Sequence, residues 1–288
     1  MSKKLSLKEI QKIEFNILVY LDKVCKENDI KYYISSGTLL GSVKYKGFIP
    51  WDDDIDVILL RDDYMKLISV LNNKDGRYKL LSMYNYDDYY YPFAKLVDSN
   101  TVLKENSKPI KEMGIYIDVV PMDGYKSNNI PLMIKRNRFI KNMMVRRFRI
   151  KNCIRKDFDY MKFDNKKVRL KKLKGIVYSF IDKVSLPLGY TFWTKLFDKR
   201  IRKVSFEDAK YLGVKTGNFG VKETFKKEDI IDQAEYIFEG KKFTSFKNYD
   251  LYLSSKYGDY KKEPSESQKK SHHQIEAYWK RDYHEWYY

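Results

Sequence analysis

The sequence predicts an α/β (α+β) fold, in which a small mixed sheet is flanked by helices. Short stretches rich in β-branched and apolar residues, typical of strands, alternate with segments of helical periodicity before residue 126. No internal sequence repeat is evident. The chain has 288 residues, of which 43% are hydrophobic, so it can bury the core of one large domain. We therefore expect a single domain over residues 1–288 that carries a basic helical insertion at residues 126–205.

The first element is predicted to be an amphipathic helix. Ser6 and Glu9 have capping-box spacing ahead of apolar residues that recur from Ile10 to Val24, so this helix should end near Asn28 and pack under the first strand. The same patterns predict the elements that follow. We expect strands at residues 31–34, 55–60, 78–82, 93–97 and 114–121, and helices at residues 38–45 and 62–72.

The insertion is predicted to be helical and strongly basic. Asn129 and Pro131 form a cap with a first-turn proline, apolar residues then recur near helical spacing up to Phe148, and a second apolar segment occupies residues 176–184. Basic side chains greatly outnumber acidic ones between residues 135 and 174. A basic amphipathic helix is typical of binding to an anionic membrane surface, but a core helix with a solvated charged face gives the same pattern. Both interpretations stay open from the sequence.

A turn of phosphate-binding type is predicted near residue 37. A short strand leads into Ser35, Ser36 and Gly37, and a helical turn starts at Thr38. Free N–H groups at the start of a helix bind anions, and glycine lets a phosphate approach the backbone. Ser36, Gly37 and Thr38 are therefore candidate phosphate-binding residues, although an ordinary turn and cap has a similar sequence.

Carboxylates are crowded in the segment that follows this turn. In the predicted strand, Asp54 and Asp56 project to the same side, Asp52 shares their phase, and Asp53 points away. Carboxylates held this close repel each other unless a cation lies between them, and ligands with oxygen only suit Mg²⁺ or Mn²⁺. The alternative is an acidic turn before a strand, with Asp52 and Asp53 solvated.

A third acid interrupts an otherwise apolar strand at Asp118. A carboxylate there is costly to bury unless it is paired or bound to a metal. A salt bridge or an exposed strand end also explains Asp118 taken alone. The order of the turn, the acid pair and the third acid favours a metal site formed by Asp54, Asp56 and Asp118.

This order resembles the nucleotidyltransferase fold. The amino-acid sequences of the segments are similar to those of the LicD family of phosphotransferases, which is related to the fukutin proteins. The resemblance covers the first half of the chain and a short C-terminal block that contains His272 and His273. The matching segments are residues 37–41, 47–57, 91–101, 117–124 and 257–260. The run from Gly37 to Val57 is long and unusual in composition, so the resemblance is specific.

The resemblance implies transfer of phosphocholine, or a related phospho-alcohol, from a donor linked to cytidine diphosphate. The acceptor implied is a sugar hydroxyl of a cell-surface glycan or teichoic acid precursor, often lipid-linked. Asp54, Asp56 and Asp118 would hold one or two divalent ions, with Asp118 as the best candidate for the general base. Further candidates are Lys95 for the donor phosphates and Trp51, Asp52 and His272 for the substrate.

Two other functions remain open from the residues. The same fold also transfers a nucleotide from a triphosphate to a small molecule. A non-catalytic protein that binds polyanions is the other alternative, because 57 Lys and Arg residues against 39 Asp and Glu residues give a net charge of +18. No zinc finger or aromatic RNA-binding motif accompanies this charge, so no specific nucleic acid is expected.

Membrane-spanning and export segments are not predicted. No stretch reaches the roughly 18–20 continuous apolar residues of a membrane span, and the first residues lack the apolar core of a signal peptide. Cys25 and Cys153 are far apart in the sequence and are expected to be reduced. We therefore expect a cytoplasmic protein, and the lipid-linked acceptors that the resemblance implies would allow it to act peripherally at the inner face of the membrane.

Overall fold

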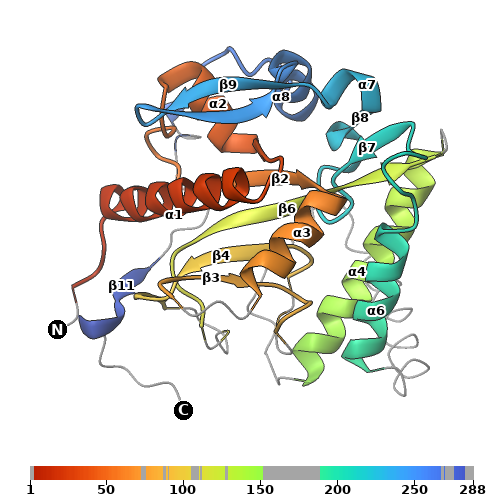
Figure 1. Cartoon of the computed structure of the whole chain (residues 1–288), viewed down its shortest axis with the longest axis horizontal. Coiled ribbons are helices and arrows are strands. Elements are labelled where there is room, and N and C mark those ends of the chain that lie inside the picture. The colour runs from red at the N-terminus through yellow and green to blue at the C-terminus, as the bar shows by residue number, and fades with distance from the viewer. Residues whose placement is uncertain are drawn as a thin grey trace.

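The computed structural model (Figure 1) describes residues 3–72, 76–86, 89, 91–104, 110, 112–126, 129–151, 189–266, 269 and 276–282. The helices over these residues are α1 (Leu7–Glu27), α2 (Ser36–Tyr45), α3 (Arg61–Leu71), α4 (Ile130–Lys151), α6 (Tyr190–Ile201), α7 (Lys227–Ile230) and α8 (Tyr249–Tyr257), with short 3₁₀ helices η1 (Gly220–Glu223) and η3 (Lys280–Asp282). The strands are β1 (Tyr33–Ile34), β2 (Asp56–Leu60), β3 (Tyr78–Leu81), β4 (Ala94–Asp98), β5 (Thr101–Leu103), β6 (Tyr116–Tyr125), β7 (Tyr211–Gly213), β8 (Thr224–Lys226), β9 (Gln233–Phe238), β10 (Lys241–Phe246) and β11 (Ala277–Trp279).

The main sheet is mixed and has the order β1-β2-β6-β4-β3. Strand β2 runs parallel to β6, whereas β1, β4 and β3 pair with their neighbours in antiparallel fashion. The second half of β6 also pairs with β7, which extends to β8. The predicted α/β class with a small mixed sheet is confirmed, because strand β6 pairs with both parallel and antiparallel neighbours.

Helix α1 covers the middle of this sheet (Figure 1). Its capping box forms as predicted, with the Ser6 hydroxyl accepting from the Glu9 N–H and the Glu9 carboxylate accepting from the Ser6 N–H. The helix packs on β6 and β4, so its predicted place under the first strand is wrong. The reason is that its buried apolar face is matched by Ile117 and Val119 of β6, which are fully buried and central to the sheet.

The C-terminal part of the chain returns to the predicted phosphate turn. The antiparallel hairpin β9–β10 contacts α2 and β1, and α8 contacts α2 and η1. In Figure 1, α2, β9 and α8 lie together at the top of the view, beyond α1. Residues 220 positions apart in the sequence are thereby brought to hydrogen-bonding distance, as the Lys256–Ser36 contact shows.

The two described helices of the insertion pack against each other beside the sheet (Figure 1). Ile140, Met143 and Met144 of α4 form a small core with Trp193 and Phe197 of α6. Much of the predicted apolar face of α4 is therefore covered by protein, while Leu132 and Phe139 of α4 and Phe192 of α6 stay exposed at 41%, 40% and 44%. The apolar segment at residues 176–184 and Cys153 lie outside the described residues. Within the described part of the chain, no helix combines the length and the apolar character needed to cross a membrane.

Candidate active site

A cavity of about 1080 Å³ lies beside the start of α2. Its lining includes Ser36 and Gly37 of that helix start and three carboxylates from the segment before β2 and its first residue, Asp52, Asp54 and Asp56. Residues 256–265, at the end of α8 and beyond it, supply most of the opposite wall. Two segments from opposite ends of the sequence therefore enclose one space.

The start of α2 presents backbone to this cavity. Ser35 precedes the helix in extended conformation, and Ser36, not Thr38 as predicted, is its first residue. A Cβ atom added to Gly37 would lie 2.5 Å from Asp52 Oδ2, so glycine is required for the close approach of the acids to the helix start. The Thr38 side chain serves a different purpose, because its hydroxyl accepts a hydrogen bond from the Asp56 N–H at 2.9 Å and so ties α2 to β2.

The carboxylates at the cavity act on one another. Burial, and then the neighbouring Asp54, raise the pKa of both Asp52 and Asp56. Strand β2 begins only at Asp56, so strand alternation does not account for the closeness of Asp54 and Asp56. Asp52 and Asp53 are 7% and 2% exposed, which excludes the interpretation that they are simply solvated.

Asp118 lies next to Asp56 across the parallel pair β2–β6, because the two residues are register partners. On its other side it is the register partner of Lys95 of β4, whose ammonium lies 2.5 Å from its carboxylate. Lys95 is only 2% exposed, and its ammonium nitrogen lies 3.4 Å from the centre of the Tyr116 ring. Neither Asp118 nor Lys95 is among the residues that line the cavity. The pair therefore lies beside Asp56, outside the set of residues that line the cavity.

Aromatic side chains form another part of the cavity wall. Trp51 and Tyr45 line it and meet edge to face, with ring centroids 6.5 Å apart, and Phe219 and Tyr257 also line it. Trp51 is half-buried and contributes to the cavity. The remaining predicted substrate residue, His272, lies outside the described residues.

The carboxylates Asp52, Asp54 and Asp56 suit a hard divalent cation by their chemistry, but they do not form a complete set of metal ligands. Their donors are all oxygens that repel each other, which suits Mg²⁺ or Mn²⁺. As the side chains stand, no group of three or more His, Cys, Asp or Glu side chains among the described residues is placed to hold a metal ion. Mg²⁺ is commonly held by one or two carboxylates together with substrate phosphates and water, so Asp54 and Asp56 are the residues that match this mode.

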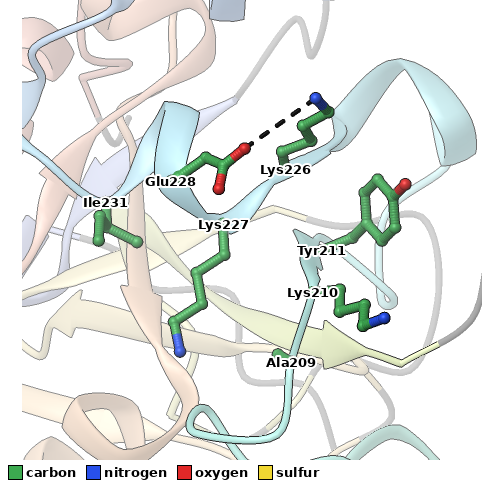
Figure 2. Close-up of a pocket in the computed structure, with 7 residues that line it drawn as sticks. All are labelled: Ala209, Lys210, Tyr211, Lys226, Lys227, Glu228 and Ile231. Carbon is green, nitrogen blue, oxygen red and sulfur yellow. Dashed lines mark ion pairs between the residues drawn. The ribbon is translucent and has the colours of Figure 1, made fainter.

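A second cavity of about 500 Å³ lies near β7, β8 and α7 (Figure 2). Figure 2 shows Lys210, Lys226 and Lys227 around it, with the Glu228 carboxylate paired to Lys226. Lys227 donates to the Phe206 carbonyl at 2.6 Å. None of the predicted site residues lines this cavity, so we place no chemistry there.

Comparison with known proteins gives the family of the chain. A family model described as "LicD/FKTN/FKRP, nucleotidyltransferase domain" matches residues 29–170. The lipopolysaccharide cholinephosphotransferase LicD of Haemophilus influenzae is 29% identical over 288 residues, which cover 96% of this chain and 99% of that protein. The chain belongs to the LicD family. Two uncharacterized proteins, RP689 of Rickettsia prowazekii and RT0683 of Rickettsia typhi, are 41% and 39% identical over 69 residues each, or 24% of this chain and 23% and 20% of their own lengths.

The LicD family match includes one side of the cavity and leaves out the other. Gly37, the acids from Asp52 to Asp56, Lys95 and Asp118 all lie within residues 29–170. The wall contributed by residues 256–265 lies beyond this range but within the alignment to the Haemophilus influenzae protein, which covers almost the whole chain. The complete site of this LicD protein therefore depends on both ends of the sequence.

Three buried charged residues of this LicD protein were missed from the sequence. Lys256 donates to the Ser36 hydroxyl and to the Glu223 carboxylate, each at 2.6 Å. Glu14 of α1 is 0% exposed, and neither of its carboxylate oxygens has a hydrogen-bond partner among the described residues. Of the three, only the burial of Glu14 could have been predicted from the sequence, because Glu14 falls on the same helical face as Ile10 and Ile17.

Proposed function

We propose that this protein is a metal-dependent phosphotransferase that moves phosphocholine from a cytidine-diphosphate-linked donor to a sugar hydroxyl of a cell-envelope glycan. One observation carries the proposal. A single cavity combines a glycine-containing helix start, crowded carboxylates and an aromatic wall, in a chain of the LicD family. The relative from Haemophilus influenzae is named a lipopolysaccharide cholinephosphotransferase, which agrees with this combination.

The donor diphosphate is assigned to the start of α2. The N–H groups of the first turn have no partner within the helix, and Ser36 and Gly37 of this turn line the cavity. Asp54 and Asp56 would hold Mg²⁺ or Mn²⁺ next to these phosphates, with Asp118 beside Asp56. When bound, the metal ion supplies positive charge that offsets the phosphate charge and orients the two reacting oxygens.

The choline group is assigned to the aromatic wall. Ring faces attract quaternary ammonium groups, and Trp51 and Tyr45 present two rings at an angle on the cavity surface. The Glu263 carboxylate accepts from the Tyr45 hydroxyl at 3.3 Å, and its charge is balanced by Lys44 at 2.6 Å. An uncharged polyol would lose the attraction to the two rings, so this wall favours choline over a phospho-polyol.

The acceptor hydroxyl is the nucleophile, and its oxygen forms the new bond to the phosphorus of phosphocholine. The bond from that phosphorus to the cytidine monophosphate oxygen breaks, and cytidine monophosphate leaves. We assign the hydroxyl proton to Asp52, because this carboxylate lines the cavity next to Asp54 and Asp56. Asp118 is the residue that the sequence predicted for this step, but it pairs with Lys95 and is not among the residues that line the cavity, which suits a supporting role better.

The decisive experiment follows the nucleotide product. The purified protein is incubated with Mg²⁺, an acceptor oligosaccharide and a panel of cytidine-diphosphate alcohols, and the nucleotides are separated by chromatography. We expect cytidine monophosphate to appear fastest with the choline donor, and to require the acceptor. Separate arms with a lipopolysaccharide oligosaccharide and a teichoic acid precursor identify the acceptor class. Release of pyrophosphate from a nucleoside triphosphate, with no turnover of any diphosphate alcohol, would replace the proposal by nucleotidyl transfer.

We also propose that the enzyme works on the cytoplasmic side, at the inner face of the membrane. Exposed Leu132, Phe139 and Phe192 lie on α4 and α6, the helices of the basic insertion, and together with its basic side chains they give it the composition of a membrane-surface segment. Binding to vesicles that contain anionic lipid should weaken steeply as salt increases. Equal binding to neutral vesicles would contradict this electrostatic account.

A further inference from the structure

Lys256 is a buried cation at the candidate active site. It lies in the last turn of α8, and its side chain is 5% exposed. Its ammonium donates to the Ser36 hydroxyl and to Glu223 Oε1, both at 2.6 Å, and lies 4.4 Å from the centre of the Phe219 ring. A buried ammonium is costly unless it is paired and hydrogen-bonded. Glu223, which is itself 5% exposed, therefore fixes where this positive charge lies.

The ammonium lies at the predicted phosphate turn. Lys256 lines the same cavity as Ser36, Gly37 and Asp56. Ser36 has a φ of +50°, in the left-handed region that residues with a side chain rarely adopt. Such a conformation persists where surrounding contacts enforce it, and it occurs often at ligand sites. The hydrogen bond from Lys256 is a contact that holds Ser36 in this conformation.

The other lysines at the cavity have different surroundings. Among its described lining residues, Lys44 pairs with the exposed Glu263 at 2.6 Å, and Lys262 is exposed. Lys256 is the buried one, and it lies close enough to Asp56 to oppose the effect of burial on the pKa of that carboxyl. A diphosphate bound between Asp56 and the start of α2 therefore meets the Lys256 charge.

We propose that Lys256 binds the donor phosphate that departs with the nucleotide, and that Glu223 positions Lys256 for this contact. The inference rests on the proposed nucleotide-diphosphate donor. As the phosphorus–oxygen bond to the nucleotide breaks, the departing phosphate gains negative charge, and the Lys256 ammonium lies where it can donate a hydrogen bond to that oxygen. Ser36 exchanges its bond to Lys256 for one to the phosphate.

The test measures binding without turnover. Calorimetric titration with cytidine diphosphate and with cytidine, in EDTA, compares wild type with Lys256→Met and with Lys256→Met/Glu223→Gln. The double variant removes both charges, so it folds even where the single variant, which leaves Glu223 buried without its cation, does not. We expect both variants to bind cytidine diphosphate about 10- to 100-fold more weakly and cytidine unchanged, because a charged hydrogen bond to phosphate is lost. Lys242→Met, at an exposed lysine of β10, is the matched control and keeps wild-type affinity.

Two results would overturn the inference. A double variant that binds cytidine diphosphate as tightly as wild type shows that the Lys256–Glu223 pair is only structural. A parallel loss of cytidine affinity shows a general collapse of the cavity instead of a lost phosphate contact. Neither readout involves choline or an acceptor, so failure of the product assay above leaves this test unaffected, and a negative result here leaves phosphocholine transfer open.

Discussion

Glu14 leads to a prediction about how stability depends on pH. It lies in α1 with 0% exposure, and its carboxylate has no hydrogen-bond partner among the described residues. Burial raises its pKa well above the usual value, and the neighbouring carboxylates, Asp54 foremost, raise it further. The folded protein therefore keeps a proton on Glu14 at a pH where the unfolded chain has released it.

The size of the effect follows from proton linkage. Between the usual pKa of glutamate, about 4.3, and the raised pKa in the fold, the folded state binds one more proton than the unfolded state. The free energy of unfolding then falls as pH rises, by about 1.4 kcal/mol per pH unit for this one group. Glu14→Gln has no proton to bind, so its slope is smaller by that amount. At low pH the variant gains nothing, since Glu14 is neutral in both states.

Urea unfolding followed by circular dichroism at pH 5, 6, 7 and 8, in EDTA, measures these slopes. We expect the stability curves of wild type and Glu14→Gln to diverge towards high pH, with the variant the more stable at pH 8. Glu27→Gln, at an exposed glutamate of the same helix, is the control and should run parallel to wild type. Parallel curves for Glu14→Gln would refute the argument, because they would mean that Glu14 is ionised in the folded protein.

Three further predictions concern the cavity and its support. Asp56→Asn should lower phosphotransfer by about 100-fold or more, and wild-type turnover would exclude Asp56 from the reaction. The same variant should raise the melting temperature in EDTA at pH 8, because it removes a carboxylate whose pKa is raised by burial and by Asp54. Gly37→Ala should reduce turnover by about 100-fold, since its Cβ would displace Asp52, and should lower the free energy of unfolding in urea by about 1–3 kcal/mol, because a buried carboxylate has to move; wild-type turnover would show that the position of Asp52 does not matter for the reaction. Lys95→Met should lower the free energy of unfolding in urea by about 3–5 kcal/mol, because Asp118 loses its cation. The double variant Lys95→Met/Asp118→Asn should recover most of this loss, and no recovery would show that the pair contributes little.

The local elements of the first half were predictable because their patterns are local. Helix α1 and its capping box, α3, β3 and β4 lie within one or two residues of the predicted ranges. The turn at Ser36 and Gly37 and the acids Asp52, Asp54 and Asp56 lie on one cavity, as a family resemblance carried by consecutive residues suggested. Each of these features depends on residues within one short segment.

Partners across the sheet were not predictable in the same way. Lys95 was expected to face the donor phosphates, but the register of β4 on β6 sets it opposite Asp118. The apolar residues of α4 were compatible with a membrane or a core, and α6 covers Ile140 and Met143. A strand or a helix shows which residues share a face, but the neighbour that covers this face comes from another part of the chain.

By itself, the sequence determined the fold class, the family, and the pairing of a glycine turn with crowded acids, since each is written in contiguous residues. Only the tertiary structure decided which charges meet. Lys256 reaches Ser36 from 220 residues away, Glu223 balances it, and Glu14 is buried near the acids with no hydrogen-bond partner in the part of the chain that the structure describes. The energy of a buried charge depends on groups within a few ångströms of it, and chain separation carries no information about that distance.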